Sequence, residues 1–293
     1  MSAIDEIQTI CVMGAGAMGA QIAQQCALHG YRVNLFDSSR DALARAATSN
    51  RGYLQRRVEK GRMSADETEA ALARVDATKD FEDAVAGADF VIEAVPEELE
   101  LKREVFSELD RCAAPHAILA SNSSAIGISH LASVTERPDQ CVNMHFFNPP
   151  LVMELVEVCR GPETSAETVE TTMDLARRIG RTPVLIRKEI AGFLVNRILG
   201  AIFHEAQWLV EHGYASVEDV DRAMELGARH PMGPFRLMDF AGLDVSYHML
   251  THIYEETGDE RFKPSRSLAD HIKAGNLGVK AGKGFYEYPR KDA

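Results

Sequence analysis

A histidine and a glutamate near the middle of the chain have the residue types needed for acid–base chemistry. Glu157 lies inside an apolar run, between Val156 and Val158, where burial of a carboxylate is costly unless a partner accompanies it. His145 is the nearest histidine in sequence, and a neutral imidazole accepts a proton near neutral pH. The two residues are therefore a candidate general base and its orienting acid. The alternative is a satisfied core histidine with a glutamate that faces solvent from an edge strand, and the sequence leaves it open.

A glycine motif near the N-terminus has the spacing of a phosphate-binding turn. Gly14, Gly16 and Gly19 form G-x-G-x-x-G directly after the apolar run 10–13. In a dinucleotide-binding turn the first glycine makes the tight turn, the second lets backbone approach a pyrophosphate, and the third lets helix and strand pack closely. The helix expected over 20–29 would direct its N-terminus at the phosphates, beside Met18.

The residue that ends the next apolar run indicates which dinucleotide fits. Asp37 follows the run 33–36, at about the 20-residue spacing at which a carboxylate meets the ribose 2′-hydroxyl. A carboxylate in that position would repel a 2′-phosphate. The sequence therefore predicts NAD, rather than NADP, as the cofactor. The alternative is an ordinary strand, turn and helix with a solvated aspartate.

The elements that must position these residues are short buried strands alternating with helices. Apolar runs at 10–13, 33–36, 90–95 and 117–120 are typical of parallel strands, and helical patterns separate them. This alternation predicts an α/β fold with a Rossmann-type doubly wound sheet, whose ligands lie at the carboxyl ends of the strands. The polar residues expected at those ends are Asp37, Glu97, Asn122 and Ser124.

The pattern changes from alternating to helical after the strand expected at 183–186. Helical periodicity covers 193–210, 217–226 and 243–253, and we expect only one more short strand, at 285–288. The sequence therefore predicts two domains, in keeping with its 293 residues. The first is an NAD-binding domain over 1–188 with an inserted helical hairpin over 41–74. The second is a C-terminal all-helical domain over 189–293 for substrate binding and dimerisation.

Composition restricts the kinds of partner that the protein can have. A net charge of -12 argues against nucleic-acid binding and against attraction to an acidic membrane. The five cysteines are scattered and form neither a C-x-x-C pair nor a metal-ligand spacing, so we expect no metal site and a reducing compartment. No apolar run is long enough to span a membrane, and the first residues do not have the pattern of a signal peptide. The expected location is cytoplasmic.

The inserted hairpin carries a basic cluster that is unusual in an acidic protein. Its members are Arg51, Arg56, Arg57, Lys60 and Arg62. The simpler interpretation is a solvated helix face. The functional interpretation is a binding site for a phosphorylated substrate.

Seven short motifs follow one another along the chain. They are S-N-S-S at 121–124, H-F-F-N-P at 145–149, L-V-E-V at 155–158, G-F-L-V-N-R at 192–197, P-M-G-P-F at 231–235, G-L-D at 242–244 and G-K-G-F-Y at 282–286. Together they resemble the short-chain L-3-hydroxyacyl-CoA dehydrogenases, including bacterial 3-hydroxybutyryl-CoA dehydrogenases. The resemblance covers essentially the whole chain. It implies reversible, NAD-dependent oxidation of a 3-hydroxyacyl-CoA to a 3-oxoacyl-CoA by a homodimer formed through the C-terminal domain.

The resemblance also implies roles for individual residues. His145 would be the general base and Glu157 its orienting partner, Ser124 would contact the substrate hydroxyl, and Asn196 would reach in from the helical domain. The cofactor contacts of the family would fall on Glu97, Lys102 and Asn122, in addition to the glycine motif, Met18 and Asp37. The CoA nucleotide would contact Lys60, with Arg56 and Arg57 beside it, which favours the functional interpretation of the basic cluster.

The chain departs from the family pattern at three positions, and two alternative functions stay open. Ala191, Glu154 and Arg236 stand where the family usually has other residues, and they leave the acyl-chain preference open. The metabolic role stays open as well, between fatty acid metabolism, butyrate or polyester metabolism, and aromatic-acid breakdown. One alternative is an NAD-dependent dehydrogenase of a CoA-free hydroxy or sugar acid, as in the gulonate dehydrogenase and lambda-crystallin group. The other is a non-catalytic NAD-binding protein.

Overall fold

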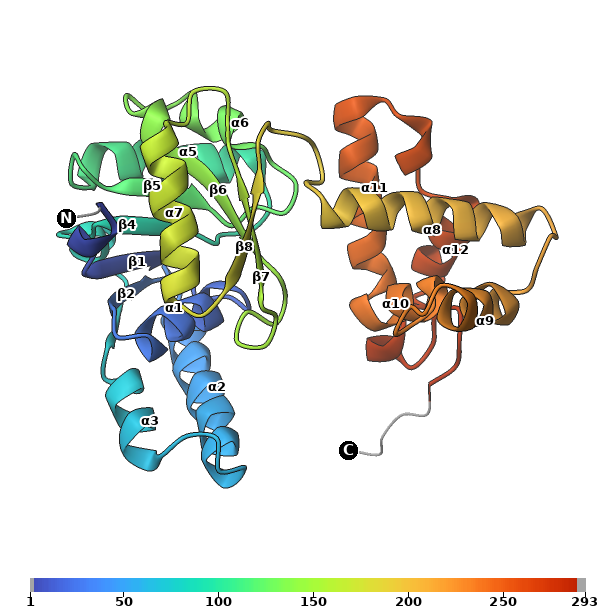
Figure 1. Ribbon diagram of the computed structural model, residues 1–293, viewed down its shortest axis with the longest axis horizontal. Helices are drawn as coiled ribbons and strands as arrows, with labels where there is room; N and C mark the ends of the chain where they lie inside the picture. Colours follow the sequence, from blue (N-terminus) through green and yellow to red (C-terminus); the bar gives the residue numbers. More distant parts are fainter. Residues whose placement is uncertain (1–2, 289–293) are drawn as a thin grey trace. The chain divides into compact units, whose positions relative to one another are not determined.

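The computed structural model describes residues 3–288, shown in Figure 1. The chain divides into two compact units, Met1–Ile190 and Ala191–Ala293. The first unit is built on a sheet and the second on helices, in agreement with the expected α/β fold and its all-helical C-terminal part. No helix in the described part of the chain is both long and apolar enough to cross a membrane.

The first unit contains one eight-stranded sheet with the strand order β3-β2-β1-β4-β5-β6-β7-β8. The reversal of order on either side of β1 is that of a doubly wound, Rossmann-type sheet, so the expected fold is confirmed. The strands are β1 (Thr9–Met13), β2 (Arg32–Phe36), β3 (Val75–Thr78), β4 (Phe90–Glu93), β5 (Ile118–Ser121), β6 (Cys141–Phe146), β7 (Leu155–Cys159) and β8 (Thr182–Ile186).

The last two strands, β7 and β8, run in the opposite direction to the other six. β7 pairs antiparallel with β6, whereas every other neighbouring pair of strands in the sheet is parallel. The segment 147–154 between the two strands is too short for a parallel connection, which needs a crossover of a dozen or more residues. The chain therefore turns back on itself here.

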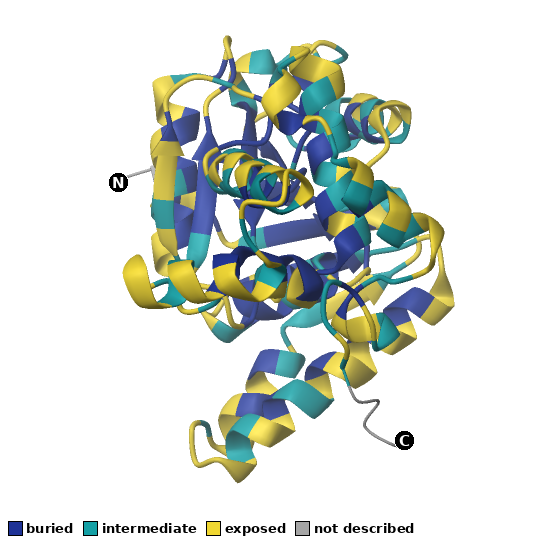
Figure 2. Ribbon diagram, turned by 90° about the vertical axis from the view of Figure 1, so that its right-hand side faces the viewer, coloured by how far each residue is buried: buried dark blue, intermediate teal, exposed yellow. Residues whose placement is uncertain are grey.

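Helices cover both faces of this sheet. One core joins α1 and α7 to the strands through residues such as Ile22 and Leu175, and the other joins α5 and α6 through Phe106 and Leu131. The strands form the buried centre, and exposed residues gather on the outer helical surfaces (Figure 2). The helices of this unit are α1 (Gly19–Leu28), α2 (Arg40–Glu59), α3 (Ala65–Leu72), α4 (Phe81–Val85), α5 (Leu99–Cys112), α6 (Ile128–Ala132) and α7 (Ala166–Arg178), with 3-10 turns at Ala3–Glu6 and Pro138–Gln140.

The helical hairpin expected over 41–74 consists of α2 and α3. The turn contains Gly61 at a φ of 64°, and α3 starts with a capping box. The Ser64 Oγ accepts a hydrogen bond from the Glu67 N–H at 3.1 Å, and the Glu67 carboxylate accepts one from the Ser64 N–H at 2.8 Å. These two bonds satisfy donors that a helix start leaves unpaired, which explains why the second helix begins at this point.

The second unit is helical and has its own core, which includes Phe203, Phe235, Met238 and Leu250. The helices over 193–210, 217–226 and 243–253 that the sequence predicts are all present. The unit consists of α8 (Val195–Glu211), α9 (Val217–Gly227), α10 (Pro234–Ala241), α11 (Leu243–Thr257) and α12 (Arg266–Lys273), with 3-10 turns at Glu260–Phe262 and Val279–Ala281.

The prediction of a strand at 285–288 is wrong. That segment contains only an isolated bridge between Lys283 and Glu287. The N–H groups of Phe285 and Tyr286 donate to the Asp239 carboxylate, each at 2.9 Å, and therefore cannot pair with a neighbouring strand. The segment that resembled a strand is instead hydrogen-bonded to Asp239, a buried residue of α10.

Candidate active site

The expected base and acid face each other across two neighbouring strands. His145 on β6 is the register partner of Glu157 on β7, and the imidazole Nδ1 lies 2.8 Å from the Glu157 Oε2. The side chains are 7% and 1% exposed. β7 is an interior strand, so Glu157 does not face solvent from a sheet edge. Since an ionised carboxylate can only accept, Nδ1 carries the hydrogen and the basic lone pair is on Nε2.

The loop that follows β5 reaches the end of the strand that carries His145. The Asn122 Oδ1 accepts a hydrogen bond from the Phe146 N–H at 2.9 Å. The imidazole also contacts the Phe147 ring, with 4.6 Å between ring centroids. Asn122 is thus fixed next to the candidate base, at the carboxyl end of the sheet where a doubly wound fold binds its ligand.

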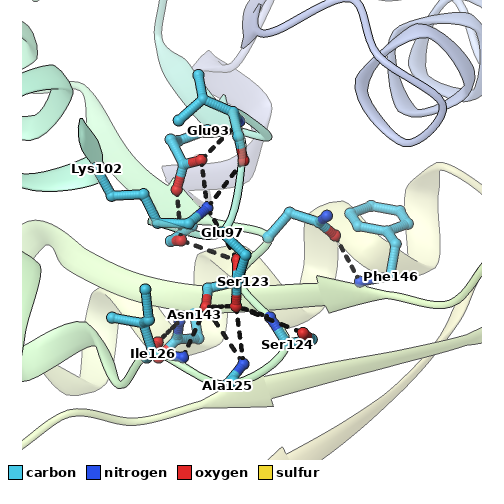
Figure 3. A network of polar contacts seen from close by, with 12 residues as sticks. Glu93, Glu97, Lys102, Ser123, Ser124, Ala125, Ile126, Asn143 and Phe146 are labelled. Carbon is cyan, nitrogen blue, oxygen red and sulfur yellow. Dashed lines mark hydrogen bonds and ion pairs between the residues drawn. The ribbon is translucent and has the colours of Figure 1, made fainter. Parts of the chain in front are cut away.

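Glu97 gathers several donors from the same loop, as Figure 3 shows. Its Oε1 accepts from the N–H groups of Ser124 at 3.0 Å and Ala125 at 3.1 Å, and also from the Ser123 hydroxyl. Burial raises the pKa of the Glu97 carboxyl, but the Lys102 ammonium and the hydrogen bonds from Ser123 and Ser124 outweigh burial and lower this pKa below its usual value. The side chain stays 38% exposed, so Glu97 is an accessible carboxylate held among loop donors.

The side chain of Lys102 is buried and does not reach into an open site. Its side chain is 1% exposed, and its Nζ lies 2.7 Å from the Glu93 Oε1 and 3.2 Å from the Glu97 Oε2. Lys102 therefore lies behind Glu97. Sequence reasoning missed Glu93, although this glutamate lies inside the apolar run 90–95, and a carboxylate in such a run was the signal that identified Glu157.

The glycine loop has the geometry that a dinucleotide requires. Gly14 has a φ of 103°, and a Cβ on it would lie 2.7 Å from the Ala94 carbonyl oxygen. A Cβ on Gly19 would lie 1.8 Å from the Gly14 oxygen, because the loop and the start of α1 pack without space for a side chain. A Cβ on Gly16 would meet nothing within 4 Å, so backbone is open to a ligand there.

Asp37 and Met18 border the same loop. The Asp37 carboxylate accepts from the Ala15 N–H at 2.8 Å and from the Ser39 N–H at 2.8 Å, which fixes it at the end of β2 beside the glycines. Met18 is the N-cap of α1 and has no side-chain capping bond. A helix start without a side-chain cap next to an open glycine fits a phosphate, and the neighbouring carboxylate fits a ribose hydroxyl, so these residues suit NAD.

The basic cluster of the hairpin is divided between a hollow and the outer surface. A hollow of about 800 Å³ in the first unit is lined by Arg57 and Arg62, together with Tyr53 and Arg181, whereas Arg56 and Lys60 do not line it. Arg51 is paired with Glu69 at 2.6 Å. The structure thus groups part of the predicted cluster around one concave surface.

Asn196 lies in the first turn of α8, in the second unit, so its expected reach to His145 stays a prediction. Among residues 3–288 no group of three or more acidic, histidine or cysteine side chains could hold a metal ion. His252, one of two histidines four residues apart on α11, is paired with Glu256 at 3.3 Å.

A Rossmann-type sheet with a dinucleotide loop and a histidine–carboxylate pair at its carboxyl edge defines a class, the nicotinamide-dependent dehydrogenases. Two family models identify the branch of this class. The 3-hydroxyacyl-CoA dehydrogenase NAD binding domain matches residues 9–190, and the C-terminal domain of the same family matches residues 192–288. The chain belongs to the 3-hydroxyacyl-CoA dehydrogenase family. It is an NAD-dependent dehydrogenase, as the motifs predicted.

Individual relatives agree with this assignment. A probable 3-hydroxybutyryl-CoA dehydrogenase of Bacillus subtilis is 41% identical over 286 residues, which are 98% of this chain and 99% of the relative. The (S)-3-hydroxybutyryl-CoA dehydrogenase of Ralstonia eutropha superposes with a TM-score of 0.92 at 38% identity, covering 97% of this chain and 100% of that structure. A diketoreductase is similar at a TM-score of 0.85 and 32% identity, covering 96% of this chain and 99% of its own.

Proposed function

We propose that the protein oxidises (S)-3-hydroxybutyryl-CoA reversibly to the 3-oxoacyl-CoA. The observation that carries this proposal is the buried His145–Glu157 pair, with 2.8 Å between Nδ1 and Oε2, in a chain that matches 3-hydroxybutyryl-CoA dehydrogenases along nearly its whole length. The pair supplies a base where the fold holds its cofactor, and the relatives indicate the substrate.

The chemistry requires a base on the hydroxyl and an acceptor for the hydride. NAD supplies the hydride acceptor when it is bound. His145 takes the hydroxyl proton on Nε2, while Glu157 keeps the ring in the correct tautomer and stabilises the imidazolium that results. In the reverse direction the same imidazolium, together with Ser124 and Asn196, would polarise the 3-oxo group.

The cofactor contacts that we propose follow from the fit of the glycine loop. Gly14, Gly16 and Gly19, with Met18, would accommodate the pyrophosphate, and Asp37 would accept from the ribose. Asn122 would border the nicotinamide end, because it is hydrogen-bonded to Phe146 beside His145, and Glu97 would do so because it is hydrogen-bonded to Ser124 in the same loop as Asn122. All of these proposed contacts lie at one edge of the sheet.

For the CoA nucleotide we propose the basic surface of the hairpin. Arg57 lines the hollow, Arg56 is exposed in the last turn of α2, and Lys60 is exposed at the C-cap of the same helix. Guanidinium groups bind phosphate through paired hydrogen bonds, and a lysine adds a point charge. A basic surface of this kind would attract a polyanionic substrate even though the protein as a whole is acidic.

A homodimer through the second unit is part of the proposal. Large apolar side chains remain exposed on this unit, and contiguous surfaces of this kind mark interfaces in soluble proteins. They include Ile198 at 61%, Tyr214 at 70%, Leu226 at 76%, Phe240 at 69% and Val245 at 54% exposure.

A cytoplasmic location is proposed from the thiols. All five cysteines are free. Burial raises the pKa of Cys26, Cys141 and Cys159 to about 12, so these thiols stay protonated and unreactive. Free, buried thiols are typical of proteins in a reducing compartment.

The test compares CoA-linked and CoA-free substrates. We expect NADH formation with 3-hydroxybutyryl-CoA and little with free 3-hydroxybutyrate, and a panel of C4 to C16 acyl-CoA substrates would establish the preferred chain length. Equal or better turnover of the free acid would favour the second candidate, a dehydrogenase of a CoA-free substrate. The similarity to a diketoreductase is the observation that keeps this candidate in the test. Absence of any turnover would support the non-catalytic alternative.

A further inference from the structure

A buried ion pair lies directly behind the candidate cofactor site. Glu93, the last residue of β4, is 0% exposed, and Lys102 of α5 is 1% exposed. The Lys102 Nζ lies 2.7 Å from the Glu93 Oε1. Burying two charges costs more than their attraction usually returns, so a buried ion pair is weak support for stability. A role in arranging the candidate cofactor site would explain why this pair is buried beside it.

Glu93 is connected to the loop after β5 as well as to Lys102. Its Oε2 accepts from the Ser121 hydroxyl at 2.6 Å, and its Oε1 accepts from the Val95 N–H at 2.7 Å. The Ser121 oxygen in turn accepts from the Ser123 N–H at 3.1 Å. The carboxylate of Glu93 thus fixes the base of the loop that carries Asn122 and Ser124.

Lys102 connects Glu93 to Glu97. An ammonium has three N–H donors. For Lys102 the three nearest acceptors are the Glu93 Oε1 at 2.7 Å, the Val95 carbonyl oxygen at 3.2 Å and the Glu97 Oε2 at 3.2 Å. Figure 3 shows the ammonium between the two carboxylates. With its donors directed at these groups, Lys102 can act on a ligand through the carboxylate of Glu97, which is the accessible one of the two carboxylates.

We propose that Glu93 and Lys102 are positioning residues for the cofactor site, with Lys102 acting through Glu97 and without touching NAD. Glu97 takes the ammonium on one oxygen and the donors of Ser123, Ser124 and Ala125 on the other. Its accessible carboxylate and the loop after β5 are therefore held in one arrangement. This role rests on the proposed placement of NAD beside Glu97 and Asn122.

The test is a double-mutant cycle between Lys102 and Glu97, read out as the dissociation constant for NADH without any acyl substrate. We expect Lys102→Met and Glu97→Gln each to weaken NADH binding about tenfold, and the double variant to bind no more weakly than the weaker single variant. A lysine that contacts the cofactor itself would give multiplied effects, and that result would overturn the proposal.

A folded variant without the buried charges separates positioning from stability. Glu93→Gln combined with Lys102→Met removes both charges together, which a protein interior tolerates far better than the loss of one partner. We expect a thermal midpoint close to that of the original protein and NADH binding weakened about tenfold. Unchanged NADH binding in this folded variant would contradict the positioning role.

A matched control is available in the same unit. Asp110 and Arg137 form a mostly buried pair at 2.8 Å that does not involve the cofactor loop. Asp110→Asn combined with Arg137→Met should leave the NADH dissociation constant unchanged, and an equal weakening there would show a general structural effect and refute the proposal. If the original protein bound no NADH at all, the cofactor assignment would fail and the positioning role with it. If it bound NADH and the Glu93 and Lys102 variants did so equally well, only the positioning role would fail.

Discussion

At the residue scale, apolar neighbours in the sequence identified one buried carboxylate, Glu157, and did not identify another, Glu93. Glu157 stands between two valines, so its need for a partner was evident, and the structure supplies His145 at 2.8 Å. Glu93 is also flanked by apolar residues in the run 90–95, but it is the last residue of β4, and sequence cannot show whether a residue at a strand end turns inward or outward. Its partner Lys102 lies on the following helix, and only the folded chain brings the two together.

His145 provides the direct test of the proposed base. We expect His145→Ala to lower turnover about 10²- to 10⁴-fold, because general base catalysis contributes that much. NADH binding should be nearly unchanged, since the imidazole is proposed to act on the substrate. Steady-state kinetics with acetoacetyl-CoA and a fluorescence titration of NADH measure the two quantities. Full activity in the variant would refute the assignment.

Gly16 allows binding to be separated from folding. A Cβ at this position meets nothing within 4 Å, so Gly16→Ala should leave the thermal midpoint within a few degrees of the original. The added methyl group would stand where a pyrophosphate approaches, and we expect NADH binding to weaken at least tenfold. Gly19→Ala is the contrasting variant, because its Cβ would lie 1.8 Å from the Gly14 oxygen and should destabilise the fold. Normal NADH affinity in Gly16→Ala would show that no phosphate lies there.

At the element scale, the sequence predicted those helices and strands that carry a strong local signal. The buried strands and the capped hairpin were found. β3 was missed because none of its residues is buried, and α4 and α6 were missed because each is only five residues long. The false strand at 285–288 had an apolar pattern but no strand to pair with. Its N–H groups are taken by Asp239, and no local pattern reports a partner so far away along the chain.

Asp239 should therefore be important for the stability of the second unit. The residue is 0% exposed and accepts from the N–H groups of Phe285 and Tyr286 and from the Tyr288 hydroxyl. Asp239→Ala leaves these donors without a charged acceptor, and we expect a loss of about 2–5 kcal/mol in unfolding free energy by urea denaturation. Asp270→Ala, at an exposed position, should change it by less than about 0.5 kcal/mol. Equal stability of the two variants would contradict this account of the C-terminal segment.

Asp89 connects the starts of two strands and makes part of the stability depend on pH. Its carboxylate accepts from the N–H groups of Gln8 and Thr9. Burial raises the pKa of Asp89, but these bonds and His116 outweigh burial and lower this pKa below 3.8. A lowered folded-state pKa stabilises the protein above pH 3.8, and this contribution disappears as the pH falls through the folded-state pKa.

The matching measurement compares Asp89→Asn with the original protein at several pH values. Urea denaturation should show a less stable variant at pH 7, with the difference shrinking as the pH falls from 5 toward 3. Asp76→Asn, at an exposed position on β3, is the control for carboxylates in general. A difference that stays constant down to pH 3 would show that the hydrogen bonds of Asp89 do not depend on its charge.

At the scale of the whole molecule, charge and division into units govern what the protein can bind. The protein has a net charge of -12 but a basic hairpin, and counting charged residues in the sequence is enough to predict both. It could not predict that Arg51 is engaged with Glu69 while Arg57 borders a hollow, because both arrangements depend on where the hairpin folds.

Replacing the basic residues of the hairpin should affect the nucleotide part of the substrate. We expect Arg57→Ala combined with Lys60→Ala to raise the KM for acyl-CoA about tenfold, and to leave the KM for the corresponding acyl-pantetheine almost unchanged. Arg51→Ala is the control, since its charge is already paired at the surface. An equal rise for both substrates would remove the proposed phosphate contact.

The reversed direction of β7 has a consequence for how the active site can vary. Imidazole and carboxylate belong to two strands held in one antiparallel ladder, with His145 opposite Glu157. If the pairing slipped by a single residue, one of the two side chains would turn to the other side of the sheet and the contact would vanish. The pairing of the two strands thus sets the distance between His145 and Glu157. Insertions or deletions between the strands are therefore tolerable only within the connecting segment 147–154, where they leave the alignment of the strands unchanged.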